Sequence, residues 1–414
     1  MENILYITVA APFGEQESFI MKEMVALRKA GASMLIAPRT KGNGRVFHQE
    51  GRTLLDCTLT YPLLDLRMIG IFIRELFTNR KFRFLLKKVA FRSRRPAILV
   101  KNLIVMPKSV FLYKIIRKKN ISHIHVHWGA TTATMGYLIS KLSDIPISIT
   151  VHRGDIWQNN LLKEKVVSSR FVRCISEKGK NDLLKITGER YGHKVEVIHM
   201  GAVVPGADKE GQDISRSAGR SAPAGAINIA VPANLIKLKG HVFLVDACKI
   251  MARSEGRYFK IFFYGSGPFE KVLKKKIRHE DLSGLIEMPG RIDNGMLLGK
   301  YDKNEIDVVV LPSVTTESGE CEGIPVSLME AMAYGVPVVA TDTGAIPELL
   351  NGGAGLMVPE KDPAALADAV IKLSGDADLY AGISRRGYER VAEHFNIDNI
   401  SGRLLQRIME KKGR

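Results

Sequence analysis

Apolar residues are spaced in two different ways along this chain, and each spacing predicts a kind of element. Short runs that are apolar throughout are typical of buried parallel strands, and longer stretches with an apolar residue at every third or fourth position are typical of helices. In the first half, strands are predicted at 3–10, 33–38, 123–128, 147–152, 171–176 and 195–200, and helices at 17–29 and 131–142. Residues 63–119 are predicted to be mostly helical, with breaks at Pro96 and Pro107.

A second series of the same kind begins at residue 227. Strands are predicted at 227–233, 259–264, 307–312, 336–340 and 356–359, with a short extended piece at 286–288. Helices are predicted at 241–253, 268–276, 325–335 and 363–373, followed by a helical tail at 379–412 with a break near 396–399. Alternation of strands and helices indicates an α/β fold with doubly wound parallel sheets.

Residues 205–226 separate the two series. They are rich in Gly, Ala, Ser and charged residues and almost free of large apolar ones, which is typical of a linker. We therefore predict one doubly wound domain at 1–204 and another at 227–397, with a helix at about 398–414 packed back on the first. Since such sheets bind ligands at the carboxyl ends of their strands, two facing domains predict a cleft between them.

Composition narrows the class of protein. Of the 414 residues, 45% are hydrophobic and 25% charged, as in soluble globular proteins, and no apolar run reaches the ~18 residues of a membrane span. The four cysteines are scattered, which favours a reducing compartment over a disulfide framework. No basic residue precedes the apolar stretch near the N-terminus, so a signal peptide is not expected. These features predict a cytoplasmic protein.

The net charge of +18 is concentrated in one segment. No acidic residue occurs between Glu75 and Asp144, while Arg80–Lys119 is dense in Lys and Arg interleaved with Phe and Leu. This pattern favours an amphipathic surface that binds an anionic membrane. A solvated basic face remains an alternative, and nucleic acid is a weaker one because no nucleic-acid motif accompanies the charge.

Candidate chemistry gathers in residues 317–350. Pro325 suits the first turn of a helix, whose N-terminal N–H groups form an anion site beside Glu322, Gly323 and Ile324. Glu330 lies within that helix, and carboxylates accept hydrogen bonds from hydroxyls. A phosphate site between hydroxyl acceptors predicts a sugar nucleotide as ligand. From spacing alone, Glu330 could equally be a surface residue, and Glu322 could simply stabilise the helix dipole.

The same stretch resembles the retaining glycosyltransferases of family four, which have the GT-B fold of two Rossmann-like domains. Residues 322–330 match the family's E-x7-E motif, and 331–340 and 344–348 match the segments that follow. Residues 234–240 and 264–268 are similar to the family's G-R-L-x-x-x-K-G and G-x-G-P turns, and 17–20 and 151–155 to segments of its first domain. Within the family, the chain resembles bacterial exopolysaccharide and lipopolysaccharide biosynthesis members.

The resemblance implies roles for individual residues. Glu322, Lys239 and His152 would be catalytic: Glu322 faces the donor sugar, Lys239 neutralises the leaving diphosphate and His152 contacts the transferred sugar or its phosphate. Donor-binding residues would be Glu330, which accepts hydrogen bonds from ribose, together with Asn234, Gly14, Gly323, Ile324 and Val326. Asn234 departs from the family, which usually has Arg there, so Lys239 becomes the main cation. Each position also has a structural alternative: turn glycines, a packed histidine, or a solvated lysine.

The implied reaction transfers a sugar from a nucleotide-diphosphate donor to a hydroxyl with retained anomeric configuration. The acceptor would be a growing, lipid-linked polysaccharide or glycolipid at the inner face of the cell membrane. No cofactor is implied. His123, His125 and His127 share one strand face, but no carboxylate or cysteine accompanies them, so a metal is not expected. Two alternatives remain: a nucleotide-sugar epimerase of the same fold, and a basic membrane- or nucleic-acid-binding protein with degenerate chemistry.

Overall fold

The computed structural model describes residues 3–14, 17–41, 49–93, 95–206, 219–223, 225–253 and 258–410. The chain divides into two compact units: unit 1 is Met1–His199 with Asp398–Arg414, and unit 2 is Met200–Ile397. Most of the predicted linker at 205–226 lies outside the described residues. Each unit has its own parallel sheet and its own hydrophobic core.

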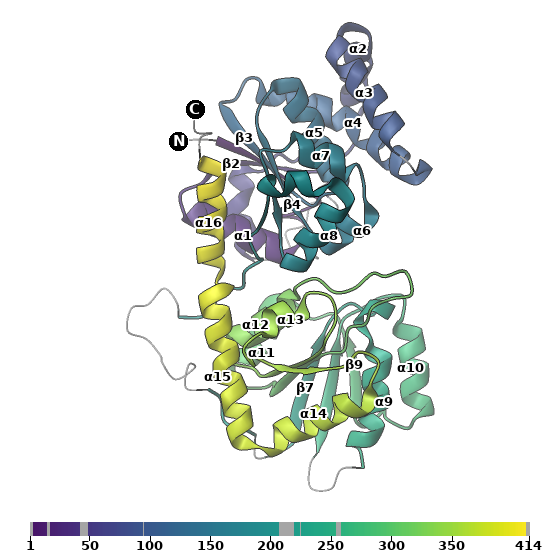
Figure 1. The fold of residues 1–414 in the computed structure, drawn as a ribbon, viewed down its shortest axis with the longest axis vertical. Helices are drawn as coiled ribbons and strands as arrows, with labels where there is room; N and C mark the ends of the chain where they lie inside the picture. The colour runs from purple at the N-terminus through teal and green to yellow at the C-terminus, as the bar shows by residue number, and fades with distance from the viewer. Residues whose placement is uncertain are drawn as a thin grey trace. The chain divides into compact units, whose positions relative to one another are not determined.

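Unit 1 is built on a parallel sheet whose described strands have the order β2-β1-β3-β4-β5-β6 (Figure 1). The strands are β1 (Asn3–Thr8), β2 (Ser33–Pro38), β3 (Ile121–His127), β4 (Ile147–Val151), β5 (Phe171–Cys174) and β6 (Val195–Val197). The helices are α1 (Ser18–Lys29), α2 (Leu66–Thr78), α3 (Arg80–Arg92), α4 (Pro96–Ile116), α5 (Thr131–Ser143), α6 (Arg153–Gln158), α7 (Leu162–Ser168), α8 (Glu177–Thr187) and α16 (Ile397–Met409), with 3₁₀ turns η1 (Gln49–Cys57) and η2 (Glu189–Lys194). The strand order places the topological switch point between β1 and β3, where doubly wound sheets bind ligands.

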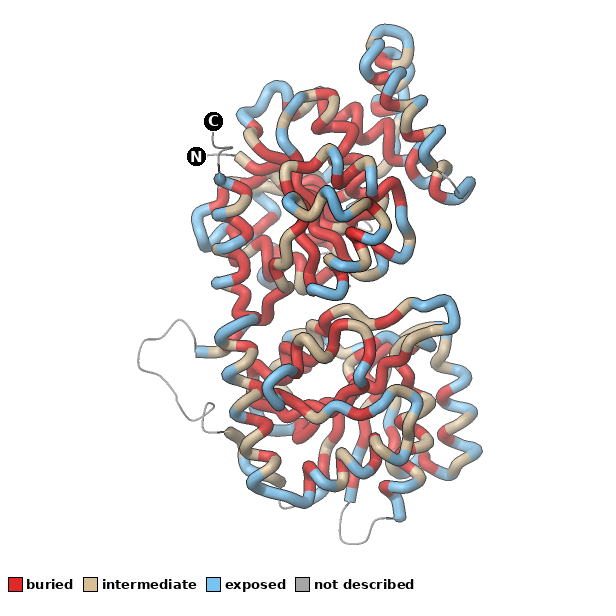
Figure 2. Tube along the Cα trace, in the orientation of Figure 1, coloured by how far each residue is buried: buried red, intermediate tan, exposed pale blue. Residues whose placement is uncertain are grey.

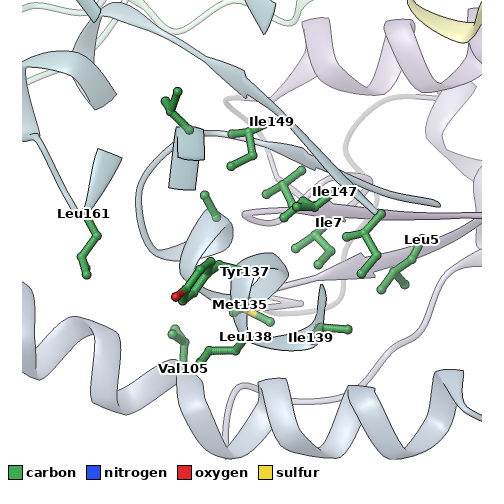
Figure 3. Close-up of a cluster of buried hydrophobic side chains, with 14 of the residues drawn as sticks. Leu5, Ile7, Val105, Met135, Tyr137, Leu138, Ile139, Ile147, Ile149 and Leu161 are labelled. Atoms are coloured by element: carbon green, nitrogen blue, oxygen red, sulfur yellow. The ribbon is translucent and has the colours of Figure 1, made fainter. Parts of the chain in front are cut away.

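Both faces of this sheet are covered, as its continuous apolar strands require (Figure 2). On one face, β1 and β4 pack against α4 and α5, and Figure 3 shows Ile7 and Ile149 among the side chains of this core. On the other face, α16 contributes Leu404 and Ile408 to a cluster with α1 and β1. The C-terminal helix is therefore part of the core of unit 1.

The basic segment forms α3 and α4, which Figure 1 shows with α2 at one corner of unit 1. The predicted break at Pro96 is the first turn of α4, where a missing N–H costs nothing. The predicted break at Pro107 is wrong, because α4 continues through it. Residues 105–113 are buried there, so packing offsets the lost hydrogen bond. Among the described residues, no helix combines the length and hydrophobicity that a membrane span requires.

Unit 2 has a second parallel sheet with the described strand order β12-β11-β10-β7-β8-β9. The strands are β7 (Ile227–Pro232), β8 (Phe259–Tyr264), β9 (Ile286–Gly290), β10 (Val308–Leu311), β11 (Val338–Thr341) and β12 (Leu356–Val358). The helices are α9 (His241–Met251), α10 (Glu270–His279), α11 (Asn294–Asp302), α12 (Val326–Ala333), α13 (Ile346–Leu350), α14 (Pro363–Gly375) and α15 (Ala377–His394), with the 3₁₀ turn η3 (Lys237–Lys239). Here the switch point lies between β7 and β10. The predicted α/β fold with two doubly wound sheets is confirmed.

Several predicted boundaries differ from the structure. β1 and β5 end two residues earlier than predicted, because the chain turns into loops at the carboxyl edge of the sheet. The predicted break at 396–399 is shorter and earlier, since α15 ends at His394 and α16 begins at Ile397. Pro325 is the N-cap of α12 and not its first helical residue. Helices α6, α7 and α8 of unit 1, and α11 and α13 of unit 2, were not among the predicted elements.

Candidate functional site

Lys239 and Glu322 meet at the switch point of unit 2. Lys239 ends the 3₁₀ turn that follows β7, and Glu322 lies in the loop between β10 and α12. Lys239 Nζ lies 2.5 Å from Glu322 Oε2, and the hydroxyl of Ser313 donates to the same oxygen at 2.9 Å. Two residues that lie far apart in sequence thus form a half-buried ion pair where an α/β sheet binds its ligand.

Two glycines make this approach possible. Gly240 has φ +62°, and a Cβ on it would lie 1.8 Å from the carbonyl oxygen of Pro312 at the end of β10. Gly344 has φ +63°, and its Cβ would lie 2.0 Å from the carbonyl oxygen of Glu322. Both positions therefore exclude any side chain. The first glycine brings the Lys239 turn against β10, and the second seats the turn before α13 against the Glu322 loop.

Glu330 is buried on α12 and is held from a neighbouring helix. Its two carboxylate oxygens each lie 3.1 Å from the amide nitrogen of Asn294, the first residue of α11. A carboxylate can accept several hydrogen bonds, so this contact leaves acceptor capacity on Glu330. Asn294 was not predicted from the sequence, because α11 carries no clear amphipathic pattern.

The other predicted donor-binding residues of unit 2 lie in the loops that carry Lys239 and Glu322 or at the start of α12. Asn234 is exposed in the loop after β7, and Val326 is the first residue of α12. Ile324 is buried, whereas Gly323 is half-buried. The turn at 264–268 packs beneath Asn234, because a Cβ on Gly265 would lie 2.0 Å from the carbonyl oxygen of the preceding residue, Ala233. Asn234 brings no charge to this loop.

His152 lies at the end of β4 in unit 1 and is the N-cap of α6. Its backbone N–H donates to Asp155 at 2.9 Å. The imidazole packs on the indole of Trp128, with ring centroids 4.2 Å apart, and Phe19 lies beside both rings. Trp128 has φ +80°, a strained conformation for a large residue, and such strain is typical of functional sites.

A buried polar network continues from His152 into the sheet. Nε2 of His152 lies 2.8 Å from Nε2 of His127, and Nδ1 of His127 lies 3.0 Å from the hydroxyl of Tyr6. That hydroxyl donates to Glu23 at 2.8 Å, and Arg173 donates to the other oxygen of Glu23 at 2.6 Å. Tyr6, Glu23 and Arg173 were not predicted from the sequence, because each lies within a strand or helix that is otherwise apolar or amphipathic.

The charges in this network are balanced by pairing. Burial alone would raise the pKa of Glu23, but Arg173 and His127 hold it well below its usual value. Burial lowers the pKa of His152 well below its usual value, and His127 adds to that effect. Burial and the Glu23 carboxylate raise the pKa of Tyr6. At neutral pH the network therefore contains one buried ion pair, a neutral phenol and a neutral His152.

Gly14 lies in the loop between β1 and α1, which Glu17 holds in place. The Glu17 carboxylate accepts hydrogen bonds from the backbone N–H groups of Ala10 and Ala11, at 2.6 and 2.7 Å, and from the indole of Trp128 at 2.8 Å. A Cβ on Gly14 would lie 3.0 Å from the Cβ of Ala10. One carboxylate thus links the Gly14 loop to the ring that packs on His152.

His123 and His125 have hydroxyl partners on β4. Both contact the hydroxyl of Ser148, at 2.7 and 2.8 Å, and His125 also contacts Thr150 at 3.1 Å. Burial lowers the pKa of His123 to about 3. Over the described part of the chain, no three His, Cys, Asp or Glu side chains are grouped as metal ligands. These two histidines are neutral, packed members of the sheet.

The predicted site residues thus fall into two groups, one on each unit. Lys239, Glu322 and Glu330 occupy the switch-point side of unit 2, and His152 and the Gly14 loop occupy that of unit 1. The sequence predicted His152 at a strand end and Glu330 within a helix, and both lie there. Their partners Ser313, Asn294 and Glu17 emerge only from the structure.

Comparison with known proteins identifies the family. The family described as glycosyl transferases group 1 matches residues 219–390. An amylovoran biosynthesis glycosyltransferase, AmsK of Erwinia amylovora, is 31% identical over 300 residues, which cover 69% of each chain. A putative colanic acid biosynthesis glycosyltransferase, WcaL of Salmonella typhimurium, is 38% identical over 198 residues; these are 47% of this chain and only 48% of that relative.

Solved structures show the same fold at low sequence identity. Anabaena HepE, in complex with UDP and glucose, has a TM-score of 0.71 at 16% identity, over 99% of this chain and 100% of that one. A glycosyltransferase from Rickettsia africae has a TM-score of 0.67 at 18% identity, over 99% and 100% of the two chains. With the GT-B fold, the match to residues 219–390 and the likeness to AmsK over two thirds of both chains, this chain belongs to the glycosyl transferases of group 1.

Proposed function

We propose that this protein transfers a sugar, with retained anomeric configuration, from a nucleotide-diphosphate sugar to a hydroxyl of a growing, lipid-linked polysaccharide or glycolipid. The observation that carries the proposal is the contact of Lys239 with Glu322 at the switch point of unit 2. It joins a cation for a diphosphate to a carboxylate for sugar hydroxyls. HepE, which shares the fold, is described in complexes with UDP and UDP-glucose, and AmsK and WcaL are described as exopolysaccharide glycosyltransferases.

In the proposed reaction the bond between the anomeric carbon and the diphosphate oxygen breaks as the acceptor oxygen attacks the same carbon from the same face. The acceptor proton passes to the departing phosphate oxygen, so no protein nucleophile is needed. Lys239 and the N–H groups at the start of α12 stabilise the charge that develops on the diphosphate. Glu322 accepts hydrogen bonds from the donor sugar, and Glu330 accepts them from the ribose.

The two units have different tasks in this proposal. Unit 2 holds the nucleotide through Glu330, Asn234 and the backbone of Gly323, Ile324 and Val326. Unit 1 presents the acceptor and brings His152 and the Gly14 loop to the donor sugar. Exclusion of water is required, since water would otherwise hydrolyse the donor.

The acceptor is proposed to lie at the inner face of the cell membrane, where α3 docks on anionic lipid. Arg80, Phe84, Lys87 and Phe91 are spaced four, three and four residues apart, so they share one outward stripe of this helix. Phe84 is 66% exposed and Phe91 is 87% exposed. The helix contains no acidic residue, and its opposite face is buried against the unit. Exposed aromatics between cations favour an interfacial lipid surface over a solvated basic face.

The transfer is tested by incubating the purified protein with labelled UDP-, GDP- and TDP-sugars and lipid-linked acceptors. Lys239→Ala is expected to lower transfer at least a hundredfold, since it removes a preorganised cation at the leaving group. Lys237→Ala is the matched control, because Lys237 is exposed in the same turn and has no part in the proposal. Donor conversion without an acceptor would identify an epimerase instead. No donor binding or transfer with any pair would refute the proposal.

Membrane docking is tested by vesicle flotation. The protein is expected to bind phosphatidylglycerol vesicles, with binding that weakens as salt is raised, and not pure phosphatidylcholine. Replacing Phe84 and Phe91 by Ser is expected to reduce binding at least tenfold. Tyr258→Ser is the control, since Tyr258 is 81% exposed on unit 2. Equal binding to both lipids, or preferred binding to nucleic acid, would contradict docking by α3.

A further inference from the structure

The hydrogen-bond geometry of the buried network behind His152 determines the positions of its protons. We infer that Glu23, with Arg173 and Tyr6, fixes the tautomer of His127 and, through it, that of His152. The inferred state is a neutral His152 with its proton on Nε2 and its lone pair on Nδ1. This inference rests on the proposed function only for its consequence in catalysis. The proton positions themselves follow from contacts within unit 1.

The assignment begins at the ion pair, where the donor is certain. Arg173 has only donors, so Glu23 must accept through Oε2, at 2.6 Å. A carboxylate has only acceptors, so the Tyr6 hydroxyl donates to Glu23 Oε1 at 2.8 Å. The single proton of Tyr6 is then used, and its oxygen can only accept from a further partner.

That further partner is His127. Its Nδ1 lies 3.0 Å from the Tyr6 oxygen and 3.4 Å from Glu23 Oε1. Both neighbours are acceptors, so Nδ1 must carry a proton; a lone pair there would face two oxygens. If His127 were also protonated on Nε2, the buried network would carry a net positive charge, because Arg173 and Glu23 already balance each other. Burial of an uncompensated charge is costly, so Nε2 carries the lone pair.

The final contact transmits this choice to His152. Its Nε2 lies 2.8 Å from Nε2 of His127, and a bond between two nitrogens needs one proton. Since His127 offers a lone pair, His152 supplies the proton. Burial lowers the pKa of His152 well below its usual value, which keeps the ring neutral. His152 therefore has an acceptor at Nδ1.

In the proposed reaction, the protonation state of His152 determines which part of the donor it contacts. A neutral ring suits the uncharged donor sugar, and its Nδ1 acceptor faces the backbone N–H of Asp155 in the capping box of α6. It does not suit the diphosphate, which would require a cation. Of the two contacts implied by the family resemblance, sugar or phosphate, the network selects the sugar. Tyr6, Glu23, Arg173 and His127 are positioning residues, since they act through His152.

The test replaces Glu23, so that each hydrogen bond from Tyr6 to His152 changes its direction. In Glu23→Gln, the amide oxygen must face Arg173, so the amide NH₂ faces Tyr6 and donates to it. Tyr6 then donates to His127 Nδ1, His127 donates from Nε2, and the proton of His152 moves to Nδ1. In Tyr6→Phe the carboxylate remains next to His127, so neither proton is expected to move. The two variants remove neighbouring polar contacts but differ in their effect on the tautomers.

The readout is nitrogen NMR of histidine-labelled protein, with His127 and His152 assigned by His→Gln variants. We expect Nδ1–H on His127 and Nε2–H on His152 in the wild type and in Tyr6→Phe, and the reverse in Glu23→Gln. Transfer by Glu23→Gln is expected to fall at least about tenfold in kcat, with donor affinity changed less than about twofold. A general structural defect would lower stability in both variants without exchanging the protons.

Each outcome supports or overturns the proton assignment or its control by Glu23. A wild-type His152 with its proton on Nδ1 overturns the inference even if Glu23→Gln fails to fold, because it is measured on the unmodified chain. Unchanged tautomers in a folded Glu23→Gln protein overturn the control by Glu23. If the wild type transfers no sugar but shows the expected tautomers, the proposed function fails while the proton assignment stands.

Discussion

Lowering the pH should destabilise unit 1 by an amount that can be assigned to His123. This ring is buried in β3, packs face to face with Phe171 at 6.3 Å between centroids, and contacts Ser148. Burial lowers its pKa to about 3, against about 6.5 in an unfolded chain. Because burial depresses the pKa of His123 in the folded state, its contribution to the free energy of unfolding is present above pH 6.5. This contribution is lost as the pH falls toward 3.

The magnitude follows from proton linkage. At pH 5.5 the unfolded histidine is protonated about ten times more often than not, while the folded one stays neutral. The free energy of unfolding therefore falls by about 1.4 kcal/mol between pH 7.5 and 5.5 from His123 alone. His123→Phe removes the titrating ring and keeps an aromatic side chain against Phe171. The variant is expected to lose about 1.4 kcal/mol less than the wild type over this interval.

The assay is urea unfolding followed by tryptophan fluorescence at the two pH values. Trp128 and Trp157 are the two tryptophans of the sequence and both belong to unit 1, so the signal reports that unit. Ser148→Ala is the control, since it removes the hydroxyl partner and leaves the buried ring. It should retain the pH dependence of the wild type. Identical pH dependence in the wild type and His123→Phe would refute the reasoning.

Four further substitutions test the geometry of unit 2. Gly240→Ala is expected to destabilise unit 2 by more than about 2 kcal/mol and to abolish transfer, because the added Cβ cannot fit at a positive φ against the neighbouring strand. Urea unfolding followed by circular dichroism measures the decrease in the free energy of unfolding. Glu330→Ala is expected to weaken nucleoside diphosphate binding by about tenfold or more, and Asn294→Ala by less, which calorimetry with UDP and GDP compares. Glu322→Gln is expected to release Lys239 from its ion pair, so that binding of the diphosphate alone is maintained or strengthened while transfer falls; a parallel loss of both would contradict this assignment.

The positions of Lys239 and Glu322, the main candidate site residues, could be predicted because they depend on strand order along the chain. Lys239 follows one strand and Glu322 another, and doubly wound topology places the ends of β7 and β10 side by side. The glycine at 240 is a local requirement of the same contact. A pattern of strands, turns and glycines in the sequence therefore contains most of the information that brings this ion pair together.

The partners of these residues could not be predicted, because nothing in their own segments distinguishes them. Asn294 begins a helix with two glycines and little amphipathicity, and its importance arises only from its contact with Glu330. Glu23 lies in a regular helix and Arg173 in a buried strand, where a charge contradicts the apolar pattern. Only the three-dimensional contact shows that these two charges neutralise each other.

The two units use the same physical device beside their proposed functional side chains. A lone cation or carboxylate at a partly buried strand end would be costly, whereas a pair can be held there at little net cost. In unit 1 the pair of Arg173 and Glu23 is fully buried, so it cannot exchange partners and serves to orient His127. In unit 2 the pair of Lys239 and Glu322 is only half-buried, so an arriving ligand can replace either partner. The neutral Asn234 adds no charge to unit 2, so under the proposed function the diphosphate must take Lys239 from Glu322, which frees that carboxylate to accept a sugar hydroxyl. Under this proposal, a single exchange of ion-pair partners would both bind the diphosphate and free Glu322 to recognise the sugar.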